Sequence, residues 1–252
     1  MPTHPLISIS DSLVSELSNN TNPYRKVEIP ILEAAYLDRF GRAFAQAPAF
    51  IYDTGHNVDR IKRDLECTLA PIAHDIGVTG SLQCYVKTVI NIFEQIIMLS
   101  RVNRVHVSVR NWFAPGDLVW HVDRSMKDFA IRFIWPLGRN YGTRYTPVSN
   151  IDLDRYNAYM RRERPLLCML DRKVLECKSS YREIWRHRPV QIADMHRCRF
   201  PFIRNPNNVV EVAPNSLVLH QFETINDLGS FHCGAAENEA TPGLQTVFTA
   251  TS

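Results

Sequence analysis

The chain has 252 residues, of which 45% are hydrophobic and 22% charged, an ordinary globular composition with ample material for a sizeable core. Its formal net charge of +3 is too small to imply a nucleic-acid or membrane partner by itself. No apolar run approaches the ~18 residues of a membrane span, and the six cysteines are scattered without a Cys-x-x-Cys pair. We therefore expect a cytoplasmic protein with free thiols and without a membrane or nucleic-acid partner.

The N-terminal part of the chain predicts an arm followed by helices. Residues 1–30 are polar and predict a mobile or loosely docked arm. Apolar residues then recur at helical spacing over 31–47 and again over 57–77, where an Asn or Asp can cap the start and a glycine ends the helix. Residues 81–100 are more apolar, which predicts a buried helix that braces a sheet.

The later part of the chain predicts short strands separated by turns. They cover 105–110, 117–123, 129–135, 143–146, 209–212, 216–222 and 244–249. Helices followed by strands indicate the α+β class, and short strands broken by turns suggest a barrel or jelly roll. We predict one integrated domain, with helical support over 1–102 and a jelly-roll core over 103–252.

A basic segment interrupts the predicted strands, as an insertion at about 150–208. Between Arg161 and Arg199 the chain carries 11 Lys or Arg against 5 Asp or Glu. A solvated, partly helical surface explains this excess. An anion-binding lid over an active site is the other interpretation.

The stretch over 117–123 carries the chemistry. His121 and Asp123 are two residues apart, and side chains at that spacing in a strand leave from the same face. A histidine and a carboxylate on one face are two thirds of a 2-His-1-carboxylate iron site. An ordinary His–Asp hydrogen bond on an exposed strand is the alternative. The third ligand should come from a distant strand, and both His220 and His232 qualify.

This pattern resembles that of the iron(II)- and 2-oxoglutarate-dependent oxygenases, which are built on a double-stranded β-helix. Their order is His-x-Asp/Glu, a turn and strand, a distal histidine, a loop and a terminal strand. The matching residues here are His121, Asp123, the turn and strand over 214–222, His232 and the strand over 244–249. The resemblance implies a cupin-like jelly roll, Fe(II), 2-oxoglutarate, dioxygen and a small organic substrate, such as an amino acid or natural-product intermediate. It implies His121, Asp123 and His232 as catalytic metal ligands, with His220 as the alternative distal ligand.

The chain departs from the family in one respect. Many members carry an Arg or Lys after the distal histidine to bind the far carboxylate of 2-oxoglutarate, and none follows His232, where Gln245 is the nearest polar strand residue. Arg132 interrupts an apolar strand and is the first candidate for this role, unless it faces solvent or pairs with a protein acid. Arg144 is the second candidate.

Two other functions remain open from the sequence. If no cation serves 2-oxoglutarate, the iron would support different oxygen chemistry, as in a cupin-like oxygenase whose substrate binds the metal itself. The non-enzymatic alternative is a degenerate jelly-roll binding module, with the basic insertion contacting an acidic partner.

Overall fold

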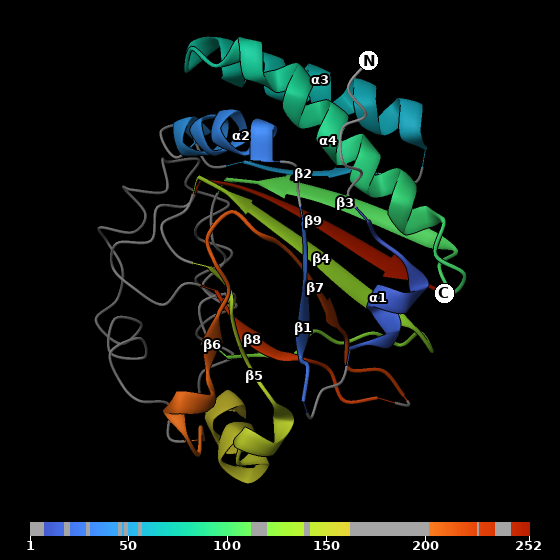
Figure 1. Cartoon of the computed structure of the whole chain (residues 1–252), viewed down its shortest axis with the longest axis vertical. Coiled ribbons are helices and arrows are strands. Elements are labelled where there is room, and N and C mark those ends of the chain that lie inside the picture. Colours follow the sequence, from blue (N-terminus) through green and yellow to red (C-terminus); the bar gives the residue numbers. More distant parts are fainter. Residues whose placement is uncertain are drawn as a thin grey trace.

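A computed structural model of the chain describes residues 8–17, 21–28, 31–44, 47, 50–54, 57–111, 120–138, 142–161, 202–225, 227–234 and 243–252. These residues form an α+β arrangement in which helices cover one face of a mostly antiparallel sheet (Figure 1). The helices are α1 (Asp11–Ser15), α2 (Ile31–Phe44), α3 (Val58–Asp75), α4 (Thr79–Ile97), one over 153–161, and the 3-10 turns η2 (Val148–Asn150) and η3 (Pro206–Asn208). Within these ranges, no helix has the length and apolar character to span a membrane.

The strands form two sheets. They are β1 (Tyr24–Val27), β2 (Ile51–Thr54), β3 (Arg104–Arg110), β4 (Ala130–Leu137), β5 (Arg144–Thr146), β6 (Val210–Glu211), β7 (Leu217–Gln221), β8 (Phe231–Cys233) and β9 (Leu244–Thr251). The larger sheet has the order β1-β7-β4-β9-β3-β2 and the smaller one the order β6-β5-β8, with every named pairing antiparallel. His121 adds a bridge to the free side of β8, so its segment extends the smaller sheet.

The chain passes repeatedly between the two sheets. From β3 it enters the smaller sheet at His121, returns through β4, crosses to β5 and β6, returns at β7, crosses to β8 and ends on β9. Such alternation is what a jelly roll requires. Because the described strands lie in two open sheets and not in a closed barrel, the jelly roll stays a prediction.

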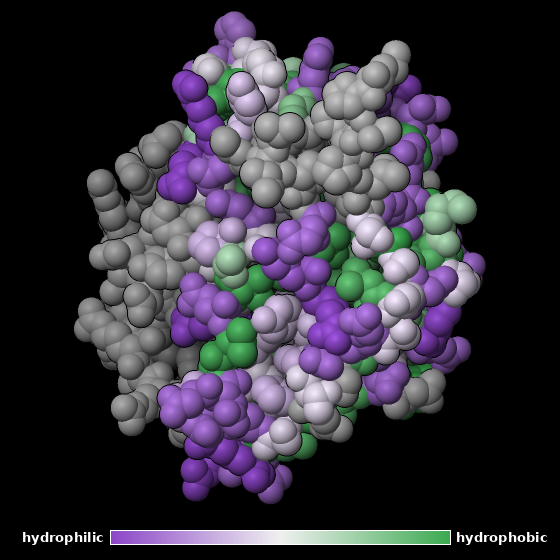
Figure 2. All heavy atoms as spheres, viewed as in Figure 1, coloured by the Kyte–Doolittle hydropathy of each residue, from purple (hydrophilic) through white to green (hydrophobic). Residues whose placement is uncertain are grey.

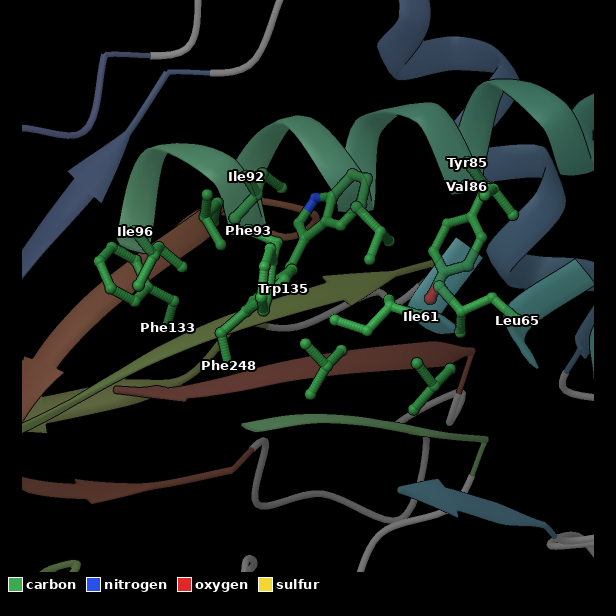
Figure 3. Packing of buried hydrophobic residues seen from close by; sticks show 14 of the residues in the cluster. Ile61, Leu65, Tyr85, Val86, Ile92, Phe93, Ile96, Phe133, Trp135 and Phe248 are labelled. Carbon is green, nitrogen blue, oxygen red and sulfur yellow. The ribbon is translucent and has the colours of Figure 1, made fainter. Parts of the chain in front are cut away.

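The hydrophobic core lies between the helices and the larger sheet. In α3, a stripe at four-residue spacing (Ile61, Leu65, Leu69, Ala73) is buried, as expected for an amphipathic helix on a core. Side chains of α4 meet Phe133 and Trp135 of β4 and Phe248 of β9 (Figure 3). One buried hydrogen bond, 2.6 Å between the hydroxyls of Tyr85 and Thr246, ties α4 to β9.

The opposite face of the larger sheet is more polar, because side chains alternate along each strand. In β3 the valines 105, 107 and 109 join the helix-side core, which leaves His106, Ser108 and Arg110 on the other face. The register places three successive rows of side chains on that face. The first row is His106, Thr249, Arg132 and His220, and the second is Ser108, Val247, Ile134 and Val218. The third row contains Arg110 and Gln245. This face looks toward the smaller sheet and carries the candidate site.

The N-terminal region differs from the arm predicted over 1–30. Within it, α1 is capped by Ser10, whose hydroxyl accepts the Leu13 N–H, and Tyr24–Val27 pairs with β7 as an edge strand. The basic insertion falls largely on residues 162–201, outside the described residues. Where it begins and ends, Ile151 and Ile203 form an antiparallel bridge. In the orientation of Figure 1, hydrophilic residues are prominent along the upper and lower margins of the surface (Figure 2).

Candidate metal centre

Three side chains gather between the two sheets. Ligand atoms of His121, Asp123 and His232 all lie within 4.8 Å of one another. Two backbone hydrogen bonds hold the histidines side by side, His121 N–H to His232 O at 2.9 Å and His232 N–H to His121 O at 3.1 Å. Trp120 and Val122 pack into a separate apolar cluster with Phe231, so these two side chains leave on the other face from His121 and Asp123. The two-residue spacing therefore brings His121 and Asp123 together as predicted.

The hydrogen bond at Nδ1 of His232 determines which ring nitrogen carries the hydrogen. Its Nδ1 lies 2.9 Å from the carbonyl oxygen of Ser230, which can only accept, so Nδ1 carries the hydrogen and Nε2 presents a lone pair. Burial, together with the nearby His220 and His121, holds the pKa of His232 well below its usual range. The ring is therefore neutral at pH 7, the form in which imidazole binds metals.

Asp123 is held at both oxygens. Arg132 donates from Nη1 to Oδ1 at 2.5 Å, and His220 Nε2 lies 3.0 Å from Oδ2. Burial raises the pKa of Asp123, but Arg132, the His220 hydrogen bond and His232 outweigh it, so the pKa lies well below the usual range. The carboxylate is ionised at neutral pH, as a metal ligand must be.

The spacing of these groups matches a cation site. His232 Nε2 and Asp123 Oδ2 are 3.6 Å apart, and neither carries a hydrogen toward the other. Two electron-rich atoms facing each other in a buried site are unfavourable without a positive charge between them. The donor set of two imidazoles and one carboxylate suits iron or another divalent transition metal.

His220 completes the cluster without joining the three-residue group. It is fully buried, and its ring centroid lies 4.2 Å from that of His232. Its Nδ1 lies 2.8 Å from the Tyr145 hydroxyl, while its Nε2 faces Asp123. Burial lowers the pKa of His220, so this ring is also neutral at pH 7.

A cavity of about 230 Å³ reaches two of the three candidate ligands, His121 and His232. It is lined by His106, Ser108, Arg110, His121, Arg132, Ile134, Thr143, His232, Gly234, Gln245, Val247 and Thr249. This lining has two arginines, of which Arg132 pairs with Asp123 behind it, and, within the described part of the chain, no acid. The cavity therefore favours an anion.

The two arginines differ in their surroundings. Arg132 pairs with Asp123, and its guanidinium carbon lies 4.7 Å from the Phe222 ring centroid. Arg110 instead donates from Nε to Gln245 Oε1 at 3.2 Å, in the row two strand steps beyond Arg132. Four residues of β-strand separate these rows, about 13 Å.

Sequence reasoning singled out His121, Asp123, His220, His232, Arg132 and Gln245 of this site, but not Arg110 or Tyr145. Arg110 carried a signal, because it continues the polar side of the alternating strand that begins at Val105. Arg144, the second candidate from the sequence, pairs in register with Glu211 and Cys233 and is absent from the cavity lining. No pattern in the sequence links Tyr145 to His220, which lies 75 residues away.

Comparison with known proteins adds no assignment. No protein-family model matches the chain, and no curated protein matches it. The site itself must carry the functional argument.

Proposed function

We propose that this chain is a mononuclear non-haem iron(II) oxygenase that uses 2-oxoglutarate and dioxygen to oxidise a small organic substrate. The observation that carries the proposal is the approach of His121, Asp123 and His232 to within 4.8 Å beside an anion-favouring cavity. Two imidazoles and one carboxylate leave positions open on iron for further ligands.

The residues fit ferrous iron. His121, Asp123 and His232 would hold it, and the lone pair of His232 Nε2 already faces Asp123 Oδ2. When bound, the iron supplies the activation of dioxygen that amino-acid side chains cannot provide. Arg132 fixes one oxygen of Asp123, and the Ser230 carbonyl fixes the ring of His232. Such outer partners orient metal ligands and strengthen binding.

The cavity also fits a dicarboxylate co-substrate. Arg110 lies beside Gln245 in the lining, and a guanidinium binds a carboxylate with two parallel hydrogen bonds. We assign the distal carboxylate of 2-oxoglutarate to Arg110, since the Arg132 guanidinium already neutralises Asp123. Arg132 is the alternative that the sequence favoured. In this proposal Gln245 belongs to the same subsite as the hydrogen-bond partner of Arg110.

The remaining lining bears on the substrate. Ile134 and Val247 form an apolar strip between the polar rows, and Ser108 and Thr249 offer hydroxyls. A cavity of about 230 Å³ would leave room for a small molecule beside the co-substrate. We also propose that β3 to β9 form a double-stranded β-helix, which the alternation of the chain between the two sheets supports.

Anaerobic spectroscopy tests the function. Fe(II) followed by 2-oxoglutarate should produce a weak visible charge-transfer band in the wild-type protein and none in Asp123→Ala. A band of wild-type strength in Asp123→Ala would contradict the assigned site. Iron binding without a band would point to an oxygenase that does not use 2-oxoglutarate, and no iron binding to a binding module.

One observation favours the oxygenase that does not use 2-oxoglutarate. His220 is a third histidine near Asp123, fully buried, and three histidines with one carboxylate would make a four-ligand metal site. In that case the substrate itself would occupy the open metal positions. Whether His220 can act as a ligand therefore separates the two iron enzymes.

A further inference from the structure

We propose that Tyr145 and His220 form a hydrogen-bond relay that orients Asp123 and keeps His220 from binding the metal. His220 is thereby a positioning residue, and the metal keeps three protein ligands. The inference rests on the proposed function for its metal, but the relay itself belongs to the protein without metal. It depends on which ring nitrogen of His220 carries the hydrogen.

The carboxylate fixes one end of the His220 ring. Nε2 lies 3.0 Å from Asp123 Oδ2, and an ionised carboxylate oxygen can only accept a hydrogen bond. Nε2 must therefore carry the hydrogen to make this contact. A nitrogen in that form has no lone pair to offer a metal.

The hydroxyl of Tyr145 fixes the other end. It lies 2.8 Å from His220 Nδ1, and both side chains are fully buried. Burial raises the pKa of Tyr145 well above its usual range, so the hydroxyl keeps its hydrogen. If His220 carried its hydrogen on Nδ1, the Tyr145 hydrogen would be left buried with no acceptor among the described residues, which is costly. Tyr145 therefore donates to Nδ1 and favours the same form of the ring.

The contact at Nδ1 of His232 has a similar length but requires the opposite tautomer of the ring. Its Nδ1 faces the Ser230 carbonyl at 2.9 Å, which requires the hydrogen on Nδ1 and leaves Nε2 bare. The two histidines are thus distinguished by one atom each, a carbonyl oxygen beside His232 and a hydroxyl beside His220. One ring is prepared as a ligand and the other as a donor to a ligand.

The relay also explains why Asp123 has a partner at each oxygen. Arg132 holds Oδ1, and His220, its neighbour on the adjacent strand, holds Oδ2. The rotation of the carboxylate is then fixed before any metal binds. Loss of such an outer partner typically weakens metal binding by about 10- to 100-fold.

Nuclear magnetic resonance of the metal-free protein tests the relay directly. Two-bond hydrogen–nitrogen correlations of ¹⁵N-histidine protein at pH 7.5 report which ring nitrogen is protonated. We expect His220 to carry its hydrogen on Nε2 and His232 on Nδ1. A hydrogen on Nδ1 of His220 would overturn the proposal. Because no metal is needed, this result stands whether or not the proposed oxygenase function does.

Zn(II) titration of the same sample counts the ligands. We expect Zn(II) to shift Nε2 of His232 and to leave His220 Nε2 protonated. Coordination of His220 would overturn the relay. If Zn(II) shifts none of the histidine signals, the result would count against the proposed metal site. The spectrum of the metal-free protein would still test the relay.

Variants separate positioning from ligation. His220→Gln keeps an N–H donor for Asp123 and should hold Mn(II) within a few-fold of wild type, whereas His220→Leu should weaken it by about 10- to 100-fold. Tyr145→Phe should weaken it by about tenfold. The matched control is Tyr24→Phe, because the Tyr24 ring stacks on Tyr145 at 4.7 Å. Equal affinities in Tyr145→Phe and Tyr24→Phe, or loss of metal in His220→Gln, would contradict the relay.

Discussion

At the scale of single residues, neighbours distant in sequence decide the chemistry. His220 and His232 are both buried beside Asp123, and the sequence favoured His232 as the distal ligand only through the family resemblance, with His220 as the alternative. The distinction lies in the atoms at Nδ1, which come from Ser230 in one case and from Tyr145 in the other. By contrast, the convergence of His121 and Asp123 was predicted from their two-residue spacing, although the described residues of the strand predicted over 117–123 form only an isolated bridge at His121.

The buried histidines should make the metal-free protein sensitive to acid. His220 and His232 have folded-state pKa values lowered by burial from the ordinary 6.5, so below pH 6.5 the unfolded chain binds protons that the folded chain excludes. The free energy of unfolding should have its full value above that pH and decrease below it, by up to about 1.4 kcal/mol per pH unit for each histidine. Urea denaturation between pH 7.5 and 5.5 measures the slope. In His220→Gln, the slope of the unfolding free energy against pH should be smaller by the contribution of one histidine. An unchanged slope in this variant would contradict the prediction.

Arg110 and Arg132 should separate in binding experiments. Arg110→Leu should retain iron but bind 2-oxoglutarate about a hundredfold more weakly, because a buried carboxylate loses its charged partner at a cost of about 3 kcal/mol. Arg132→Leu should first weaken iron binding, since Asp123 loses its cation. Anaerobic titration of each iron-loaded variant measures both effects, with Arg144→Leu as the control outside the cavity. A larger 2-oxoglutarate loss in Arg132→Leu than in Arg110→Leu would return the carboxylate to Arg132.

At the scale of elements, periodicity located the long helices and the central strands. The helix predicted over 57–77 is α3 (Val58–Asp75), and its predicted end glycine, Gly77, has φ +72°. The strands β1, β2 and β8 were missed. Each has only three or four residues and owes its form to pairing with β7, β3 or β5, which no local pattern reveals.

The contact between α2 and β4 should be intolerant of added volume. A Cβ at Gly41 would collide with the backbone of Leu137, so the helix sits on the strand end only because this residue is glycine. Gly41→Ala should destabilise the protein by about 1–3 kcal/mol through overpacking. Gly80→Ala is the matched control, since nothing lies within 4 Å of its added carbon and alanine favours helix. Equal stabilities of the two variants in urea denaturation would argue against this packing.

At the scale of the whole molecule, the site joins the two sheets. His121 and His232 belong to the smaller sheet, whereas Arg132 and His220 reach Asp123 from the larger one. The sequence predicted the α+β class and located β3 to β7 and β9. It could not supply the pairing between strands, since partners such as β3 and β9 are separated by more than a hundred residues.

Metal binding should therefore stabilise the entire fold. Zn(II) at about a hundred times its Kd should add roughly 2.7 kcal/mol, because it binds the folded chain and not the unfolded one. For a chain of this size that corresponds to a rise in Tm of about 5–10 °C. Thermal denaturation followed by circular dichroism measures it. Asp123→Ala should show no comparable rise, and an equal rise would place the metal elsewhere.

The most direct test of the central claim is the iron content of reconstituted protein. After anaerobic loading with Fe(II) and removal of excess metal, the wild type should retain about one iron per chain, as expected of a mononuclear site. His121→Ala, Asp123→Ala and His232→Ala should retain almost none while keeping a native circular dichroism spectrum. His106→Ala, a histidine of the same cavity outside the ligand set, should stay near the wild-type value. Near-wild-type iron in any of the three ligand variants, or none in the wild type, would contradict the account.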